Sequence, residues 1–122
     1  MAEQDVIQGI NAVELVGRVS AAAEERTLPS GDVFVTWRVV VDRPPPRRAA
    51  PEGRRVSSID AIDCIAWTTT TRRTAASFAV GDVVRVEGAL RRRFWQTGAG
   101  PQSRYDVEAS AAKRLARAQA SR

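Results

Sequence analysis

The spacing of apolar residues predicts two strands in the first third of the chain. In residues 12–20 the apolar side chains recur at every second position, the period of a strand with one buried face. The turn-forming run at residues 28–32 follows, and residues 33–42 then alternate over a longer stretch. Because the connection is short, we expect the two strands to pair in an antiparallel sense.

Three strands and a helix are expected after this hairpin, in an order that favours one fold class. Residues 43–57 are rich in proline and arginine, and we interpret them as a basic loop, because proline cannot join regular ladder hydrogen bonds. A third strand is predicted from about Val56, where this loop ends, to about Thr69. The later elements are a short helix at 71–79, a fourth strand at 83–95 and a fifth at about 104–111.

This order of elements is expected of an all-β protein with a five-stranded Greek-key barrel, the OB-fold, with the helix between strands three and four. Gly17 and Gly88 lie inside otherwise good strands, where a small barrel must bend. The domain is predicted to span residues 11–112, between an N-terminal segment, 1–10, and a basic C-terminal tail, 113–122, that frays. A plain five-stranded antiparallel sandwich is the alternative.

Length and charge limit the possible partners. The 122 residues suffice for one domain. The net charge of +5 is uneven, because residues 1–42 hold three basic and seven acidic groups, whereas residues 43–122 hold sixteen and seven. Such asymmetry indicates a surface that faces a polyanion, either nucleic acid or an anionic membrane. No apolar stretch approaches the roughly 20 residues that cross a bilayer, and we expect no membrane partner.

The scarcity of reactive side chains argues against an enzyme. The chain has no histidine and one cysteine, Cys64, which excludes an intramolecular disulfide and an ordinary zinc site. Asp60 and Asp63 are interpreted as surface or strand-edge charges rather than as a catalytic pair. We therefore expect a non-enzymatic protein without metal or cofactor, located in the cytoplasm, with Cys64 as a buried structural thiol.

Five sequence strings then point to a known family. In order they are NAVELVGRV (11–19), LPSGD (28–32), IDCIAW (62–67), VGDVVRVEGALRRRFW (80–95) and RYDVEA (104–109). Together they resemble the bacterial single-stranded DNA-binding protein family, SSB. The fourth string is the most specific, because it joins a Gly-Asp turn, a V-x-V-E-G-x-L strand and a basic run that ends in tryptophan.

The resemblance implies an OB-fold that assembles as a homotetramer or a dimer and binds single-stranded DNA without sequence preference, in replication, recombination or repair at the nucleoid. Such binding needs cations for phosphates and aromatic faces for bases. Trp95 shares a strand face with Arg91 and Arg93, and Trp67 falls where the family carries a stacking aromatic. The alternatives are packing in a core or subunit interface for Trp95, and packing beneath the helix for Trp67.

Other residues extend these predictions. Further candidates for the cationic track along the bound strand are Arg26, Arg38, Arg43, Arg72 and Arg73, each with a solvated surface charge as the alternative. The first strand is more apolar than one barrel needs, which predicts an oligomer interface. Its candidate residues are Val13, Leu15, Val16 and Val19. Trp37 lies on the apolar face of the second strand and is expected in the core.

Departures from the family pattern predict a weaker or specialised binder. Two further stacking positions correspond to Pro44 or Pro45 and to Ala61, none of which is aromatic, and Asp63 stands where the family has a basic or neutral group. The end of the chain, QASR, lacks an acidic tip, and replication partners recruited by such a tip are not expected. The alternatives are an OB-fold interaction or structural subunit without DNA binding, and a protein that binds RNA or anneals single strands.

Overall fold

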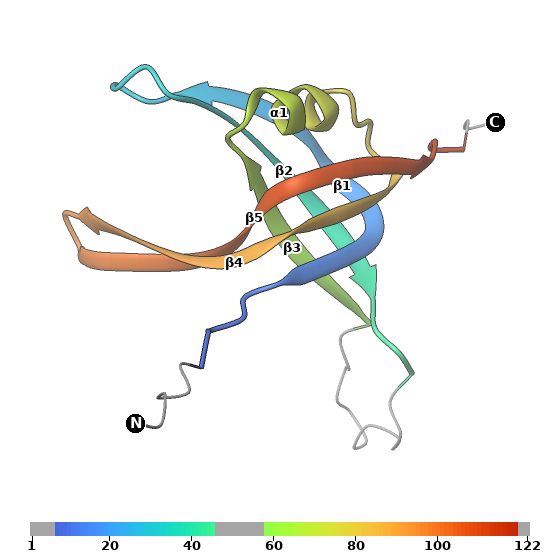
Figure 1. The fold of residues 1–122 in the computed structure, drawn as a ribbon, viewed down its shortest axis with the longest axis horizontal. Coiled ribbons are helices and arrows are strands. Elements are labelled where there is room, and N and C mark those ends of the chain that lie inside the picture. Colours follow the sequence, from blue (N-terminus) through green and yellow to red (C-terminus); the bar gives the residue numbers. More distant parts are fainter. Residues whose placement is uncertain (1–6, 46–57, 120–122) are drawn as a thin grey trace, which may run out of the picture.

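The computed structural model describes residues 7–45 and 58–119 of the chain (Figure 1). Its elements are β1 (Val13–Thr27), β2 (Val33–Asp42), β3 (Ile59–Ala66), α1 (Thr69–Ala76), β4 (Val83–Thr97) and β5 (Gly100–Ala116). The strands close into a barrel in the order β1-β2-β3-β5-β4, with β4 pairing back onto β1. All pairs are antiparallel except β3 with β5. The predicted OB-fold is therefore confirmed.

The barrel core consists of the alternating apolar positions of the strands. Val39 of β2 and Val86 of β4 are fully buried, and Cys64 of β3 is 1% exposed. Trp37 is buried at 3% exposure and meets Phe78, just beyond α1, edge to face at 6.2 Å between ring centroids. Both predictions of core positions, for Trp37 and for Cys64, are confirmed. The helix end thus caps one opening of the barrel.

Two glycines lie where neighbouring strands approach most closely. A Cβ atom on Gly17 would meet the carbonyl oxygen of Val40 at 2.2 Å, and one on Gly88 would meet that of Glu108 at 2.0 Å. The ladder between β4 and β5 also shifts register between Glu87 and Gly88. Glycine at these positions is thus a steric requirement of barrel closure, as the sequence indicated for a strand that bends.

The boundaries of β3 and α1 differ from the predicted ones. The third strand ends at Ala66, before the expected Thr69, because Thr68 caps α1: its side chain accepts a hydrogen bond from the backbone N–H of Thr71. The helix accordingly begins and ends earlier than predicted. Arg43 and the two prolines after it adopt no regular structure, while residues 46–57 of the predicted basic loop lie outside the described residues.

The fifth strand is longer than predicted at both ends. It begins at Gly100, inside the expected turn, and it ends at Ala116, inside the segment expected to fray. Residues 113–116 instead pair with β4, where Val83 faces Ala116. The prediction that the fifth strand ends at about residue 111 is therefore wrong, because the long β4 supplies ladder partners as far as Ala116.

The two long hairpins position the candidate site. Beyond the barrel, β4 and β5 stay paired out to Thr97 and Gly100, and β1 and β2 stay paired out to Thr27 and Val33. Both hairpins extend on the same side of the barrel (Figure 1). Side chains on their facing surfaces can therefore contact one extended ligand.

Candidate nucleic-acid interface

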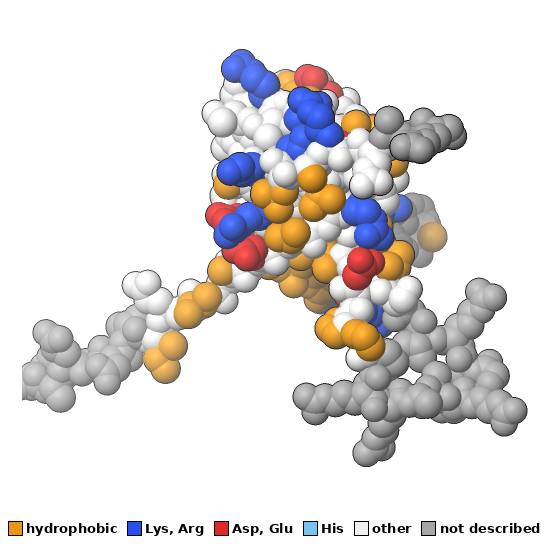
Figure 2. Space-filling view, turned by 90° about the vertical axis from the view of Figure 1, so that its right-hand side faces the viewer, with side chains coloured by type: hydrophobic (Ala, Val, Ile, Leu, Met, Phe, Trp, Pro, Cys, Tyr) orange, Lys and Arg blue, Asp and Glu red, His pale blue; other side chains and the backbone are white. Residues whose placement is uncertain are grey.

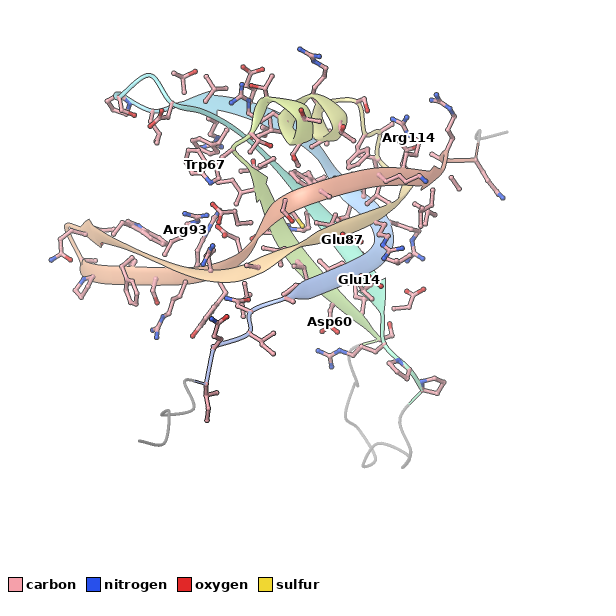
Figure 3. All side chains as sticks on the ribbon, viewed as in Figure 1. Glu14, Asp60, Trp67, Glu87, Arg93 and Arg114 are labelled. Carbon is pink, nitrogen blue, oxygen red and sulfur yellow. The ribbon has the colours of Figure 1, made fainter. Side chains whose placement is uncertain are left out.

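Trp67 lies between the two hairpins, immediately after β3. Its ring centroid is 5.0 Å from that of Phe34 on β2, with a tilt of 39° between the planes. From the other hairpin, the guanidinium of Arg93 lies 5.8 Å from the Trp67 ring centroid. Figure 3 shows Trp67 and Arg93 directed toward each other from β3 and β4. The arrangement forms an aromatic surface with a cation beside it, which suits base stacking next to a phosphate.

Arg72 supports Trp67 from α1. One of its terminal nitrogens donates to the backbone carbonyl of Trp67 at 2.7 Å and to that of Val33 at 3.2 Å. The guanidinium thus ties the segment after β3 to the start of β2. Arg72 was predicted to neutralise phosphate, whereas these contacts make it first a positioning residue for Trp67. Its neighbour Arg73 is exposed on α1.

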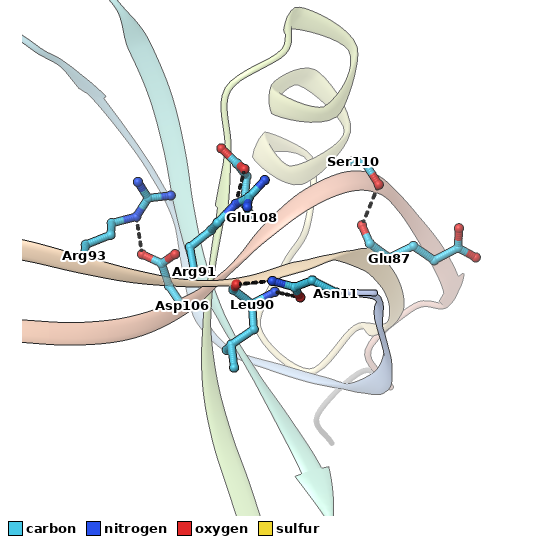
Figure 4. A network of polar contacts seen from close by, with 8 residues as sticks. All are labelled: Asn11, Glu87, Leu90, Arg91, Arg93, Asp106, Glu108 and Ser110. Atoms are coloured by element: carbon cyan, nitrogen blue, oxygen red, sulfur yellow. Dashed lines mark hydrogen bonds and ion pairs between the residues drawn. The ribbon is translucent and has the colours of Figure 1, made fainter. Parts of the chain in front are cut away.

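A hollow of about 350 Å³ lies beside Trp67 and Thr68 and is bounded by strands β4 and β5. Arg91 and Glu108 line it and form an ion pair at 2.9 Å. Asn11 closes one side: its amide donates to the carbonyl of Leu90 at 2.7 Å and accepts from the N–H of Leu90 at 2.8 Å (Figure 4). Both bonds fix the segment before β1 along the edge of β4.

Arg93 is held by a buried carboxylate. Its Nε donates to Oδ2 of Asp106 at 2.8 Å, and Asp106 is only 2% exposed. Among the described residues, Nη2 of Arg93 and Oδ1 of Asp106 are buried without a hydrogen-bond partner. A buried pair of this kind fixes geometry, because removing one partner leaves an uncompensated charge. Asp106 therefore orients Arg93 toward Trp67.

Most of the arginines predicted to neutralise phosphate are already paired with carboxylates. Besides Arg91 and Arg93, the exposed pairs are Arg26 with Glu24 at 3.0 Å, Arg38 with Asp63 at 2.9 Å and Arg43 with Asp60 at 2.7 Å. The bond with Asp60 also raises the pKa of Arg43. Asp60 is the second residue of β3 whereas Trp67 follows the end of this strand, and Figure 3 shows the two well separated. Arg43 is therefore not part of the group around Trp67.

Six cations have no carboxylate partner among residues 7–45 and 58–119: Arg72, Arg73, Arg92, Arg104, Lys113 and Arg117. Arg104 faces Arg93 across the β4–β5 ladder, and Trp95 follows two positions further out at 45% exposure. Sequence reasoning missed Arg104 and also missed Phe34. Phe34 could have been found in the sequence, because it is an aromatic residue on the otherwise polar face of the alternating strand at 33–42.

Comparison with known proteins decides the family. The sequence model of the single-strand binding protein family matches residues 10–115. The chain belongs to this family. Similar curated members are a single-stranded DNA-binding protein of Thermotoga maritima, 33% identical over 90 residues, and single-stranded DNA-binding protein 3 of Listeria innocua, 28% identical over 91. The alignments cover 74% and 75% of this chain but only 62% and 54% of those proteins.

A solved structure supports the fold assignment of this SSB-family chain. The structure of a Plasmodium falciparum SSB in complex with single-stranded DNA superposes with a TM-score of 0.68 at 18% sequence identity. The match covers 89% of this chain and 96% of that one. At this identity the likeness shows the fold alone.

The predicted interface on β1 of this family member requires a correction. Val19 is 1% exposed and lies in the barrel core, so it cannot face a second copy. Val13 and Leu15 are half-buried and pack against the same core, because the odd positions of β1 point inward. Val16, at 47% exposure, is the member of the predicted set that points outward.

The end of the SSB barrel opposite the hairpin tips has a mixed surface. Figure 2 shows its basic side chains interspersed with acidic and hydrophobic ones. Here Asp82 accepts from the backbone N–H groups of Ala79 and Ala118 and from Nε of Arg114, at 2.7 to 2.9 Å. These bonds hold the pKa of Asp82 down, at about 2. This buried carboxylate ties the turn before β4 to the residues that follow β5.

The described residues form neither a metal-binding cluster nor a membrane-spanning helix. Within residues 7–45 and 58–119, no three side chains of the histidine, cysteine, aspartate and glutamate types cluster in a way that would hold a metal ion. In the same part of the chain, α1 is too short and too polar to cross a membrane.

Proposed function

We propose that this chain binds single-stranded DNA between its β1–β2 and β4–β5 hairpins, by base stacking and phosphate neutralisation and without sequence preference. The observation that carries the proposal is the position of Trp67, which meets Phe34 from one hairpin and Arg93 from the other. Exposed Trp95 offers a second ring further along the same face. Every base has a ring face, so stacking of this kind accepts any sequence.

The electrostatic part of this binding comes from fewer groups than the number of arginines indicates. Arg91 and Arg93 are neutralised by Glu108 and Asp106. Exposed ion pairs are weak, about 0 to 1 kcal/mol, and a phosphate can compete for Arg91, but Arg93 stays bound to a buried carboxylate. Arg104 carries no such partner among the described residues and is assigned the main phosphate contact.

Family membership supports a role with DNA in replication, recombination or repair, at the nucleoid in the cytoplasm. We include assembly into a dimer or tetramer in the proposal, with the outward face of β1 around Val16 as the contact. The described residues supply stacking rings and cations, and the proposed activity is binding rather than catalysis.

The test is a titration with fluorescein-labelled oligo-dT, followed by anisotropy and by tryptophan quenching at two salt concentrations, with duplex DNA and oligo-rU as comparisons. We expect quenching, preference for the single strand and an affinity that falls with salt. Trp67→Ala is expected to weaken binding about tenfold, since one stacked base contributes about 1 to 3 kcal/mol. Val80→Ala, an exposed apolar residue in the turn before β4, is the control.

A second candidate function is an OB-fold interaction subunit that has lost DNA binding. The internal pairing of Arg38 with Asp63, which uses up charge on β2 and β3, favours it. Absence of binding at low salt, in a protein that circular dichroism shows to be folded, would reject the first proposal and leave this one. Binding without quenching would reject the stacking role of Trp67 and Trp95.

A further inference from the structure

The outer face of the β4–β5 hairpin carries an aromatic group that the proposed site does not use. Side chains alternate along a strand, so Arg92 and Phe94 point away from the face that holds Arg93 and Trp95. Tyr105 lies opposite Arg92 in the ladder and therefore shares this outer face. Phe94 is 69% exposed and Tyr105 is 57% exposed. Large exposed rings that lie together on one face usually mark a binding surface.

Arg92 joins the two rings into one surface. Its guanidinium carbon lies 4.8 Å from the Phe94 ring centroid and 5.4 Å from that of Tyr105. It also donates to the hydroxyl of Ser103 at 3.2 Å from Nη2 and at 3.4 Å from Nε. We call Arg92, Phe94 and Tyr105 the outer cluster. Its three members hold one another in place without covering the outward surfaces of the rings.

The charge of the outer cluster distinguishes it from the inner face. Arg91 and Arg93 each meet a carboxylate, whereas Arg92 meets none in the described part of the chain. The ladder partners on this face, Ser103 and Tyr105, are uncharged at neutral pH. Among the described residues, the outer cluster is therefore a cation between exposed rings that has no carboxylate partner.

These properties select one class of ligand. An apolar protein surface, or a second copy that placed the same cluster against this one, would bury Arg92 without a counter-charge, which is costly. A single-stranded nucleic acid supplies both complements, a phosphate for the guanidinium and bases for the rings. The hairpin is a two-stranded ribbon with Gly98 and Ala99 at its tip, so the inner and outer faces are separated only by its thickness.

We propose that the outer cluster is a second contact surface for the same single strand, which passes from the inner face around the β4–β5 hairpin onto Phe94 and Tyr105. This inference rests on the proposed function, because the strand must first occupy the inner face. It assigns to the chain a site longer than the surface between the hairpins alone, and it makes the outer contacts dependent on the length of the bound strand.

The test compares oligo-dT of two lengths, about 6 and about 20 nucleotides, which bracket the usual range for one OB-fold. Phe94→Ala and Arg92→Gln are both expected to leave the affinity for the short strand unchanged. The affinity for the long strand is expected to fall about tenfold in Phe94→Ala and severalfold in Arg92→Gln. The control Arg117→Gln removes the same charge from an exposed position beyond β5. It is expected to change neither affinity beyond a small general effect.

Tyr105 gives a readout that does not depend on mutation. It is the single tyrosine of the chain, so its ring yields one set of aromatic signals in a ¹H–¹³C spectrum. These signals are expected to shift with the long strand and to stay in place with the short strand, while tryptophan quenching occurs with both. The comparison therefore reports the outer and inner faces separately in one sample.

The outcomes that overturn the inference are distinct. If both variants bind the long strand with the affinity of Arg117→Gln, the outer surface is not used although the proposed function stands. The same conclusion follows if the Tyr105 signals stay in place while tryptophan quenching saturates. Equal weakening for both lengths would mean that the outer cluster only supports the inner face. Loss of self-association by Phe94→Ala in light scattering would identify a second copy as the occupant. Absence of binding by the unmodified protein at either length would reject both proposals.

Discussion

The two halves of the β4–β5 ladder are built from the same strands but differ in how deeply their side chains are buried. In the barrel half, Val84, Val86 and Val107 are at most 1% exposed and belong to the core. In the protruding half, Phe94 and Tyr105 are more than half exposed. Backbone pairing continues through both. The comparison teaches that the buried core and the proposed ligand contacts lie at different ends of one hairpin. Substitutions in one half should therefore leave the property of the other half unchanged.

The largest effect is expected from a glycine pair that tests this separation. In Gly88→Ala the new methyl group meets the carbonyl oxygen of Glu108 at 2.0 Å, and the strands must move apart. We expect the free energy of unfolding to fall by about 3 kcal/mol or more in urea denaturation. Gly98→Ala, in the protruding half, meets nothing within 4 Å and is the matched control. Its stability should change by less than about 1 kcal/mol. Equal losses in both variants would contradict the separation.

A smaller loss of stability is expected from Asp82→Asn at the barrel end. The pKa of Asp82 is lowered to about 2 in the folded protein by bonds from Ala79, Ala118 and Arg114. A depressed pKa stabilises the folded state above the ordinary value of 3.8, and this contribution is lost as the pH falls through about 2. Asp82→Asn should therefore melt at a lower temperature at pH 7.

Melting temperatures measured at low pH provide the control for Asp82→Asn. Between pH 4 and pH 2 the melting temperature of the unmodified protein should fall more steeply than that of Asp82→Asn, since only the former has this carboxylate to protonate. Parallel curves would show that Asp82 contributes nothing to the pH dependence. Affinity for oligo-dT at pH 7 should be the same for both proteins, because Asp82 lies outside the protruding half.

Substitutions in the protruding half should change DNA affinity rather than stability. Arg104→Gln removes a cation that has no carboxylate partner in the part of the chain that the structure describes. The affinity of this variant for oligo-dT should fall severalfold, and its salt slope should fall by about 0.7. Arg26→Gln removes a cation that Glu24 already neutralises on β1, and a smaller change in slope is expected. Melting temperatures of the two variants should match that of the unmodified protein. A larger slope change for Arg26→Gln would reverse the assignment of phosphate contacts.

The smallest effect concerns Cys64 in the barrel. Burial raises the pKa of this thiol to about 12, with Asp63 and Asp106 adding to the rise. Reaction with a thiol reagent at pH 8 should be negligible in the native protein and complete in denaturant. Saturation with oligo-dT should leave this rate unchanged. Rapid native labelling would mean that the barrel half opens more readily than its burial indicates.

The sequence predicted the barrel through its alternating positions, and it failed where alternation stops. β1 continues to Thr27 although Ala21, Ala22 and Ala23 show no polar and apolar period. The ladder to β2 shifts register in this stretch, between Val19 and Ala21 and between Ala21 and Glu24. A bulge of this kind changes which face of the sheet the following side chains occupy. The pattern of polar and apolar residues alone does not reveal such a bulge.

The sequence predicted the positions of the aromatic residues at the candidate site better than the ion pairing of its arginines. Trp67 and Trp95 follow from strand parity and the family resemblance, and the structure places both at the hairpins. The pairing of Arg93 with Asp106 depends on the register between two strands, which is set by barrel closure rather than by local sequence. For the same reason, the residue pattern does not indicate that Arg104 lacks a carboxylate partner among the described residues.

The seam between β3 and β5 has a consequence for how the chain acquires its structure. It consists of two parallel pairs, Cys64 with Val107 and Ile65 with Glu108, and β5 joins β3 to β4 through it. The first three strands form a meander, and the seam that closes the barrel forms only when the fifth strand arrives from far along the chain. Such long-range closure makes folding slow. On a ribosome, this barrel completes itself only when its last strand has emerged.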